Sequence, residues 1–330
     1  MKKILIVTDN LPDQINGVVT TFKNIEQYAL ADGYELVYLD PRSFPHINCP
    51  GYPEVKLSLP WRIGTKIKDI NPDHIHIATE GPLGCAANVW GWICKWKYNT
   101  SYHTKFPEFL KEMYNIPMFL TYMYLRWFHN HSGVVLTTTK TMVDLLKEQK
   151  FKRNVVPWTR GVNRENLAPT ENGTLHMQAV VLYVGRVSKE KNLDDLCVLQ
   201  DKFSIQIVGD GPDRKRLEEK YPKVKFLGYR AGSDLANCYA NADVFCFPSI
   251  SDTFGIVIIE SLSLGTPVAA YPVAGPIDIL EQGINGYMSD NLELAIRQAI
   301  MLDRDIVKAS SEKWTWQECW NIFRSFLVDL

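Results

Sequence analysis

The sequence has no apolar run long enough to cross a membrane. A spanning helix needs about 18 or more consecutive apolar residues, and no run in this 330-residue chain reaches that length. The apolar stretch Ile4–Val7 follows Lys2 and Lys3; it is too short for the apolar region of a signal peptide and is typical of a first β-strand. We therefore expect a chain without a leader peptide or a membrane-spanning helix.

The chain also lacks internal repeats, low-complexity tracts and any Cys-x-x-Cys pair. Its 7 cysteines are odd in number, which favours reduced, mostly buried thiols in a cytoplasmic protein over a disulfide framework. Hydrophobic residues make up 46% of the chain and charged residues 22%, as in globular proteins. The length suits two domains of ordinary size.

The formal net charge of −1 conceals an uneven distribution. Residues 1–162 contain 19 Lys and Arg against 14 Asp and Glu, a balance of +5, whereas the remaining residues contain 17 against 23, a balance of −6. A basic half indicates contact with an anionic partner. The alternatives are that opposite charges face each other across a cleft or are simply scattered, and the sequence leaves them open.

Strand-like and helix-like segments alternate in both halves, which is typical of doubly wound α/β domains with parallel sheets. In the first half we predict strands at residues 3–8, 35–39, 74–78, 100–103, 134–138 and 155–158, and helices at residues 20–30, 82–97, 106–114, 118–129 and 140–149. In the second half we predict strands at residues 179–184, 204–208, 225–227, 243–247 and 267–270, and helices at residues 256–264 and 316–328. The polar stretch 163–177 is the expected linker.

The segment 251–260 carries the strongest chemical signal. It joins a predicted strand to a predicted helix, at the carboxyl end of a sheet, where open α/β folds bind ligands. Backbone amides around Phe254 and Gly255 at the helix start favour a bound phosphate. The carboxylates of Asp252 and Glu260 can accept hydrogen bonds from hydroxyl groups on two parts of one ligand. The pattern therefore indicates a sugar nucleotide.

A second charged motif, Gly185–Asn192, follows the first predicted strand of the second half. Arg186 can bind phosphate oxygens in a bidentate way, and Lys191 can act as a point charge. Cleavage of a sugar–phosphate bond leaves negative charge on the departing nucleotide, and these two cations can stabilise it without a metal. The Asp-x-Asp sequence at Asp303–Asp305 lies in a late polar stretch and is expected at the surface.

The two motifs resemble the Glu-x7-Glu and Gly-Arg…Lys-Asn signatures of retaining glycosyltransferases of family 4. That family has the GT-B fold, in which two Rossmann-like, doubly wound domains face a central cleft. Here Asp252 replaces the commoner Glu. The Asp-Thr-Phe-Gly form is similar to a subgroup that includes GDP-mannose-dependent α-mannosyltransferases and sulfoquinovosyl or glucosyl diacylglycerol synthases. The resemblance extends over nearly all of the chain.

The resemblance implies an acceptor-binding domain at residues 1–162 and a nucleotide-sugar-binding domain at residues 163–312. It implies that residues 313–330 form a C-terminal helix that crosses back to the first domain, and that residues 158–163 form the hinge. The chain is then a hexosyltransferase that needs neither a cofactor nor a metal, with a nucleotide-sugar donor as substrate.

The resemblance also implies roles for individual residues. The implied catalytic residues are His103, Asp252, Arg186 and Lys191. The donor is expected to contact Asn16, Gly17, Gly209, Tyr229, Thr253, Phe254, Gly255, Ile256 and Glu260. The acceptor side of the cleft is expected to include Glu80 and Gly81. Glu260 would receive the ribose hydroxyls, and His103 would lie beside the reacting sugar carbon.

Aromatic and basic residues gather on two predicted helices of the first half. The first helix and its end carry Trp90, Trp92, Lys95, Trp96 and Lys97, and the second carries Phe119, Tyr122, Tyr124, Arg126 and Trp127. This composition suits a lipid acceptor at an anionic membrane surface. Alternatively the aromatic side chains pack under the sheet, as we expect for roughly half of them.

The favoured interpretation is a glycolipid-forming enzyme, bound peripherally to the inner face of a membrane, that transfers a hexose from a UDP-sugar to a lipid such as diacylglycerol. One alternative is a GDP-mannose-dependent α-mannosyltransferase with a glycan or polyprenyl-linked acceptor. An alternative of another class is an inactive nucleotide-sugar-binding partner subunit, against which the intact Arg186, Lys191 and Glu260 argue. No nucleic-acid partner is expected.

Overall fold

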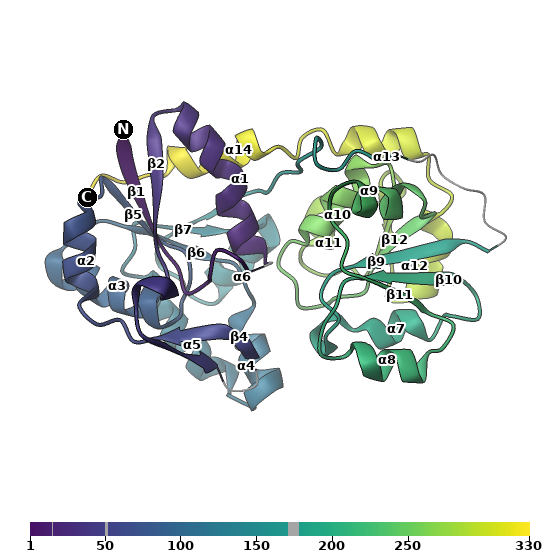
Figure 1. The fold of residues 1–330 in the computed structure, drawn as a ribbon, viewed down its shortest axis with the longest axis horizontal. Helices are drawn as coiled ribbons and strands as arrows, with labels where there is room; N and C mark the ends of the chain where they lie inside the picture. The colour runs from purple at the N-terminus through teal and green to yellow at the C-terminus, as the bar shows by residue number, and fades with distance from the viewer. Residues whose placement is uncertain (15, 50–51, 171–177) are drawn as a thin grey trace. The chain divides into compact units, whose positions relative to one another are not determined.

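The computed structural model describes residues 1–14, 16–49, 52–170 and 178–330 (Figure 1). The chain divides into two compact units, the first made of Met1–Arg160 and Trp316–Leu330 and the second of Gly161–Thr315. The predicted domain boundaries follow residues 162 and 312. The boundaries in the structure follow Arg160 and Thr315, which are two and three residues away. The assignment of the acceptor to the first unit and the donor to the second stays a prediction.

The first unit is built on a sheet of six parallel strands in the order β2-β1-β5-β6-β7-β8. These strands are β1 (Lys2–Val7), β2 (Tyr34–Leu39), β5 (His74–Ile77), β6 (Asn99–Tyr102), β7 (Val134–Thr137) and β8 (Asn154–Pro157). Each lies within one residue of its predicted bounds, so these strand predictions are confirmed. The predicted doubly wound α/β class is confirmed as well.

Helices cover both faces of this sheet. The helices are α1 (Gly17–Ala31), α2 (Ile63–Ile70), α3 (Pro82–Cys94), α4 (Phe106–Tyr114), α5 (Met118–His129), α6 (Lys140–Glu148) and α14 (Trp316–Ser325). Leu5 and Val7 of β1 share a core with residues of α2 and α3. Ile6 pairs in register with His76, whose ring packs on Phe22 of α1. Successive residues of β1 therefore serve opposite faces, as the pleat of a strand requires.

Helix α14 belongs to the first unit although the second unit precedes it in the sequence. Its Phe323 packs edge-on against Phe22 at 6.0 Å and lies 5.1 Å from the ring of Trp158. The Trp158 Nε1 donates a hydrogen bond to the carbonyl oxygen of Cys319 at 2.9 Å. The chain's last helix is thereby fixed to the first sheet.

The prediction that this helix continues to residue 328 is wrong, because it ends at Ser325. The carbonyl oxygen of Phe326 accepts a hydrogen bond from the side chain of Asn99. The Val328 carbonyl oxygen lies 2.8 Å from Nδ1 of His74. His74 and Asn99 lie on β5 and β6, so side chains of the sheet hold the residues that follow the end of the helix.

Some elements of the first unit were not predicted. They are α2, the 3₁₀ turn η1 (Pro41–Ser43), and the antiparallel pair β3 (His46–Cys49) and β4 (Tyr52–Ser58). Helix α2 carries Ile63, Ile67 and Ile70 at helical spacing, but it extends over only eight residues, too few for the period to stand out.

The second unit contains another sheet of six parallel strands, in the order β11-β10-β9-β12-β13-β14. The strands are β9 (Val180–Val184), β10 (Ser204–Val208), β11 (Lys225–Gly228), β12 (Val244–Phe247), β13 (Val268–Ala270) and β14 (Gly286–Met288). The helical segments are η2 (Lys189–Lys191), α7 (Leu193–Cys197), α8 (Arg214–Lys220), α9 (Gly232–Ala240), α10 (Ile256–Ser263), α11 (Pro276–Ile279), α12 (Leu292–Ala299) and α13 (Arg304–Ser310). The sequence patterns predicted all of these strands except the three-residue β14, and only α10 among the helical segments.

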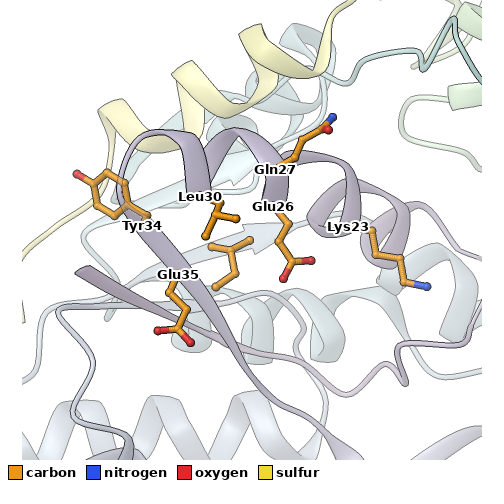
Figure 2. Close-up of a pocket in the computed structure, with 7 residues that line it drawn as sticks. Lys23, Glu26, Gln27, Leu30, Tyr34 and Glu35 are labelled. Carbon is orange, nitrogen blue, oxygen red and sulfur yellow. The ribbon is translucent and has the colours of Figure 1, made fainter. Parts of the chain in front are cut away.

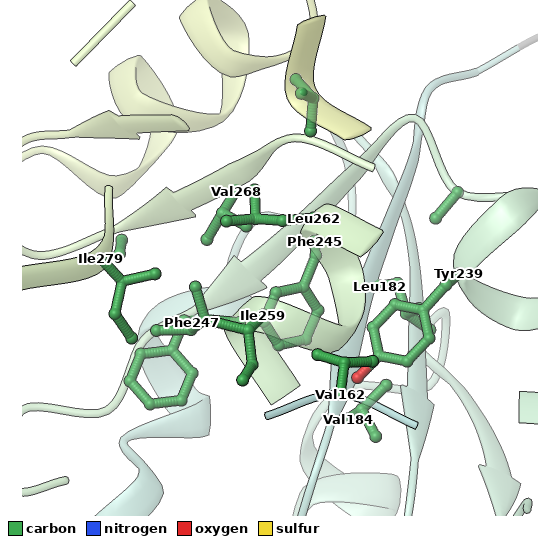
Figure 3. Packing of buried hydrophobic residues seen from close by; sticks show 14 of the residues in the cluster. Val162, Leu182, Val184, Tyr239, Phe245, Phe247, Ile259, Leu262, Val268 and Ile279 are labelled. Carbon is green, nitrogen blue, oxygen red and sulfur yellow. The ribbon is translucent and has the colours of Figure 1, made fainter. Parts of the chain in front are cut away.

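Two cores lie on the two faces of the second sheet. Leu182 of β9 points into the core shown in Figure 3, together with Phe245 and Ile259. Tyr183, the next residue of β9, points into the other core. A strand that is buried on both faces reads as a continuous apolar run, and the run Val180–Val184 has this form.

The predicted linker, residues 163–177, is only partly described. Residues 171–177 lie outside the described residues. The earlier part is attached to the second unit, because Arg164 donates a hydrogen bond to the carbonyl oxygen of Ser311 at 2.6 Å and Leu167 joins a core of that unit. The prediction of a linker is therefore wrong for this part, and the chain passes between the units at Arg160–Gly161 instead.

Candidate functional site

The charged motifs of the second unit meet where its sheet changes direction. From β9 the chain moves outward to β10 and β11, and then returns to β12 on the other side of β9. The loops that follow β9 and β12, residues 185–192 and 248–255, therefore leave neighbouring strands at the same edge of the sheet. Open α/β sheets bind ligands at such a switch point.

Gly209 lets the loop after β10 pack directly on the loop after β9. Its φ is +129°, and an added Cβ would lie 1.9 Å from the carbonyl oxygen of Gly185. Backbone amides of Gly185 and Val187 donate hydrogen bonds to the carbonyl oxygens of Val208 (3.0 Å) and Asp210 (2.9 Å). Main chain, rather than side chains, thus forms the floor of the switch point.

Lys191 and Asp252 form an ion pair between the two loops. The Lys191 Nζ lies 2.6 Å from one carboxylate oxygen of Asp252 and 2.8 Å from the other. The two side chains are 20% and 27% exposed, so solvent still reaches both. The structure thus brings together two residues that were predicted to contact the diphosphate and the sugar respectively.

Helix α10 begins directly after the Phe254–Gly255 pair. Gly255, with a φ of +86°, is its N-cap, and no side chain caps the first turn, which also lacks an acidic residue. The partial positive charge of a helix N-terminus favours an anion such as phosphate at this place. Thr253 and Phe254 are buried, and Phe254 packs edge-on against Trp314 at 5.6 Å. Their side chains therefore hold the loop, and its backbone amides are the groups suited to a phosphate. Ile256 is the first residue of the helix.

Glu260 lies on the second turn of α10 and is half-buried. The hydroxyl of Tyr239, on α9, donates a hydrogen bond to its Oε2 at 3.1 Å. Burial raises the pKa of Glu260 to about 6, and the bond from Tyr239 opposes that rise. The carboxylate is therefore ionised at neutral pH and can accept hydrogen bonds from hydroxyl groups.

Arg186 and Tyr229 are exposed at the same strand ends. Arg186 follows β9, and its carbonyl oxygen accepts a hydrogen bond from the Tyr183 hydroxyl at 2.9 Å. Tyr229 follows β11 and is 60% exposed. The two side chains are accessible to a ligand, as the sequence predicted for a diphosphate clamp and a base site, and their roles stay predictions.

The first unit has a corresponding switch point between β1 and β5. The chain goes from β1 to β2 on one side and returns to β5 on the other. Asp9, two residues after β1, accepts hydrogen bonds from the amide of Leu83 (2.8 Å) and the hydroxyl of Thr79 (2.7 Å). A Cβ on Gly81 would lie 2.5 Å from the Asp9 carboxyl carbon. The close approach of Asp9 therefore requires a glycine at position 81, a residue that was predicted on the acceptor side.

Glu80, also predicted on the acceptor side, contacts two residues of helix α5. One carboxylate oxygen lies 3.3 Å from Nε2 of His129, and its carbonyl oxygen accepts a hydrogen bond from the Tyr124 hydroxyl at 2.6 Å. The Glu80 side chain is 12% exposed and His129 is buried. Most of Glu80 is therefore engaged within the unit, and a small exposed part remains for a substrate.

His103 stands directly after β6, next to a buried arginine. Arg160 donates from Nη2 to Nδ1 of His103 at 2.9 Å, and from Nη1 to the carbonyl oxygens of Trp158 (2.7 Å) and Thr159 (2.9 Å). Burial and the charge of Arg160 lower the pKa of His103 well below its ordinary value. The imidazole is therefore neutral at physiological pH.

Asn16 and Gly17 form the start of α1. The side-chain oxygen of Asn16 accepts hydrogen bonds from the amides of Val18 and Val19, at 3.1 and 3.0 Å. This capping role engages the Asn16 oxygen and leaves the backbone of Gly17 as the part suited to a donor contact. Ile15, from the same motif, lies outside the described residues.

A cavity of about 350 Å³ lies beside α1 and β2 (Figure 2). Its lining includes Lys23, Glu26 and Tyr34 and none of the predicted site residues. The donor site described above therefore does not depend on it.

Two family models match the chain in succession. The model described as Glycosyltransferase Family 4 matches residues 15–166, and the model described as Glycosyl transferases group 1 matches residues 165–300. The chain belongs to glycosyltransferase family 4. The predicted site residues, from Asn16 to Glu260, fall within the residues that these two models match in this family 4 protein.

Curated relatives of this family 4 glycosyltransferase act on different sugars. A GDP-mannose-dependent alpha-mannosyltransferase of Corynebacterium glutamicum is 26% identical, over 87% of this chain and 76% of the relative. The sulfoquinovosyl transferase SQD2 of Arabidopsis thaliana is 30% identical, over 82% of this chain and 56% of the relative. An alpha-monoglucosyldiacylglycerol synthase of Streptococcus pneumoniae is 29% identical, over 62% of this chain and 53% of the relative.

Solved structures share the fold. A sucrose-phosphate synthase from Thermosynechococcus elongatus superposes with a TM-score of 0.78 at 16% identity, over 98% of both chains. The Anabaena protein HepE, in complex with UDP, superposes with a TM-score of 0.71 at 16% identity, over 98% of this chain and 99% of the other. These likenesses and the two parallel sheets give the family 4 protein the GT-B fold.

Two kinds of feature are absent from the residues that the structure describes. These residues contain no helix long and apolar enough to cross a membrane. They also contain no group of three His, Cys, Asp or Glu side chains placed to hold a metal ion. Asp303 caps α13 through hydrogen bonds from the amides of Asp305 and Ile306, so this part of the Asp-x-Asp sequence serves a helix.

Sequence patterns missed three residues that shape the sites. Asp9 could have been found as the first acid after the first predicted strand. Arg160 lies within the expected hinge, to which the resemblance gives no side-chain role. Tyr239 gave no signal, because its contact with Glu260 joins residues 21 positions apart on different helices.

Proposed function

We propose that the protein transfers a hexose, with retention of anomeric configuration, from a nucleoside diphosphate sugar to a membrane lipid. UDP-hexose is the favoured donor and diacylglycerol the favoured type of acceptor. The observation that carries the acceptor part is an aromatic surface on the first unit. The donor part rests on the second switch point, where the cations Arg186 and Lys191 follow β9 and the N-terminus of α10 follows β12.

Each part of the donor has a matching group in the second unit. Arg186, Lys191 and the amides at the start of α10 bind the diphosphate and stabilise the charge of the leaving nucleotide. Glu260 accepts hydrogen bonds from the ribose hydroxyls. Asp252, already 2.6 Å from Lys191, accepts hydrogen bonds from the sugar while it orients that lysine. Because these cations neutralise the diphosphate, the reaction needs no metal.

The aromatic surface consists of exposed apolar side chains on α3 and α5. These are Trp90, Trp92 and Ile93 on α3, and Phe119, Leu120, Met123 and Trp127 on α5. Trp92 and Trp127 are 66% and 41% exposed, and both pack against His131, at 6.2 and 5.8 Å between ring centroids. Other aromatic residues of these helices pack inward, with Tyr122 buried and Tyr124 against the core. A patch of tryptophans and aliphatic residues is typical of a membrane interface.

Basic residues border the aromatic surface. A hollow of about 710 Å³ beside Trp127 is lined by Arg126, His131, Lys150 and Lys152, with Glu148 as its one acidic lining residue. Each basic residue near an anionic membrane surface contributes about 1 kcal/mol to binding. The combination favours peripheral attachment to an anionic leaflet, where a lipid acceptor would be available.

Vesicle binding tests the acceptor proposal. The protein should co-sediment with vesicles that contain an anionic phospholipid, less with neutral vesicles, and less at high salt. The double variant Trp92→Ser and Trp127→Ser should lose this binding. Ile306→Ser, which removes an apolar side chain that is 53% exposed on α13 of the second unit, is the matched control. If the unmodified protein and the double variant bind anionic vesicles equally, the aromatic surface is not the membrane contact.

Product analysis tests the reaction. We would offer UDP-glucose, UDP-galactose and GDP-mannose with diacylglycerol vesicles or a soluble mannoside, and identify products by mass spectrometry. Proton NMR of the product would give its anomeric configuration. An α-linked glycolipid from a UDP-sugar is expected, and a β-linked product would overturn retention.

A second candidate is transfer of mannose from GDP-mannose to a glycan or a polyprenyl-linked acceptor. The observation that favours it is the similarity to the Corynebacterium mannosyltransferase, which extends over 87% of this chain. Competition between UDP and GDP for the donor site separates the two candidates. Inhibition by GDP alone, with mannosylation of the soluble acceptor only, would replace the lipid proposal.

A further inference from the structure

Arg160 is a buried arginine whose described hydrogen bonds all go to neutral acceptors. It is 3% exposed and donates to two carbonyl oxygens, of Trp158 and Thr159, and to the His103 ring. Its guanidinium also lies over the Trp158 ring, 4.6 Å from the centroid. An arginine held in this way cannot turn away from the histidine without leaving several donors unpaired, which is costly in a buried place.

The direction of the hydrogen bond to His103 follows from chemistry. A guanidinium has five N–H donors and no acceptor. Nδ1 of His103, at 2.9 Å from Arg160 Nη2, must therefore accept, so it carries no proton. In a neutral imidazole the proton is then on Nε2. The ring presents an N–H donor on the side away from Arg160.

We propose that Arg160 is a positioning residue that holds His103 as the Nε2–H tautomer, so that His103 donates a hydrogen bond to the transferred sugar and does not serve as a base. The proposal rests on the proposed function, in which His103 acts on the donor sugar. It goes further by assigning the direction of that hydrogen bond and the residue that sets it.

The charges around His103 agree with this state. Arg160 faces it directly, and the neighbouring histidines, His76 and His129, also disfavour a proton on the ring. A carboxylate oxygen of Glu80 lies 3.3 Å from Nε2 of His129. Burial is the largest cause of the lowered pKa of His103. The ring is therefore neutral at physiological pH.

NMR of the ligand-free protein tests the tautomer without any assay of transfer. With ¹⁵N-labelled histidine, the His103 ring should show a protonated Nε2 and an unprotonated Nδ1 at neutral pH, assigned by comparison with His103→Gln. Arg160→Met should convert the ring to a mixture of tautomers, and Arg160→Lys, which keeps a donor, should partly restore the single form. A protonated Nδ1 in the unmodified protein would overturn the proposal whether or not transfer is ever observed.

Transfer rates give an independent test. The amide nitrogen of glutamine can take the place of Nε2–H as a donor but cannot act as a base at neutral pH. His103→Gln should therefore keep kcat within about tenfold of the unmodified enzyme, whereas His103→Ala should lose about 10²-fold, the scale for one lost donor. Equal loss in both variants would show that the proton-accepting ability of the ring matters and would overturn the donor role.

Variants of Arg160 complete the test. Arg160→Met should lower kcat about as far as His103→Ala with little change in the donor KM, and the combined variant should be no worse than either alone. If Arg160→Met fails to fold, Arg160→Lys and the NMR comparison still decide the question. Arg42→Met is the matched control, because the exposed Arg42 side chain pairs with Asp40 away from His103.

Discussion

The Lys191 ammonium lies 2.6 and 2.8 Å from the two carboxylate oxygens of Asp252, although the two residues are 61 positions apart in the sequence. The pair connects the loop after β9 to the loop after β12. In the ligand-free protein each residue thus satisfies the charge of the other. A diphosphate that enters the site would meet a lysine already held in place, which lowers the entropy lost on binding.

Loss of either cation should weaken catalysis strongly. We expect Arg186→Ala and Lys191→Ala to reduce kcat/KM by about 10²-fold or more, because each removes a positive charge from the developing anion of the leaving nucleotide. Lys189→Ala, at an exposed position of the same loop, is the control and should retain activity. Thermal unfolding should show that all three variants fold. Normal turnover by either site variant would remove that residue from the mechanism.

The ion pair should be measurable as a coupling energy. A double-mutant cycle of Lys191→Met and Asp252→Asn, read by chemical unfolding, should give a coupling of about 1 kcal/mol, because the pair is direct and only partly exposed. The same cycle with Lys223 and Asp201, an ion pair whose side chains are 68% and 70% exposed, should give less. Equal couplings would mean that partial burial adds nothing to the site pair.

Donor binding should weaken in mild acid through Glu260. Its pKa of about 6 means that the carboxylate is mostly protonated at pH 5, so affinity for the intact donor sugar should fall roughly tenfold between pH 7 and pH 5. Glu260→Gln should bind more weakly at pH 7 and show little further change. Calorimetry with UDP-glucose or GDP-mannose gives the affinities. A fall of the same size in Glu260→Gln would assign the pH dependence to another group.

The same group predicts a change in stability. Because the folded pKa is raised from 4.5 to about 6, the contribution of Glu260 is fully present below pH 4.5 and is lost as the pH rises through 6. The loss amounts to about 2 kcal/mol at 1.36 kcal/mol per unit. Relative to the unmodified protein, Glu260→Gln should therefore gain free energy of unfolding between pH 4.5 and pH 7.5. Parallel stability curves for the two proteins would contradict the raised pKa.

Activity should persist after metal removal. In the proposed mechanism Arg186 and Lys191 carry the charge of the diphosphate. Excess EDTA should therefore leave the rate within about twofold, whereas a metal-assisted reaction would lose several kcal/mol of stabilisation. Complete loss that Mg²⁺ or Mn²⁺ restores would contradict the assignment.

The floor of the donor site should not tolerate a methyl group. Gly209→Ala should cost at least about 3 kcal/mol of stability, from the unfavourable φ together with the overlap with the Gly185 carbonyl. Gly232→Ala is the matched control: Gly232 has a φ of +56° and open space around it, so its cost should be about 1 kcal/mol. Chemical unfolding compares them. Similar costs would show that the close approach is relieved by small shifts of the loops.

Strand positions were predictable because a strand in a parallel sheet is buried on both faces and leaves a continuous apolar run, as Val180–Val184 does. Short helices such as α2 and α7 were not predictable, because helices of two turns or fewer repeat the helical period too few times to reveal it. The positions of the candidate donor-site residues were predictable because the carboxyl ends of neighbouring parallel strands share one edge. Their partners were not: the contacts Lys191–Asp252 and Arg160–His103 join residues 61 and 57 positions apart, and sequence spacing does not encode such pairs.

The placement of α14 in the first unit has a consequence for the order of events during synthesis. The second unit is one continuous segment, so all of its residues are available once residue 315 has left the ribosome. The first unit, although synthesised first, must wait for residues 316–330, since Trp158 and Phe22 have no Phe323 to pack on until then. We therefore expect the second unit to fold before the first, the reverse of the usual order in which the N-terminal domain folds first. Until residues 316–330 have been synthesised, the face of the first sheet that α14 covers stays open.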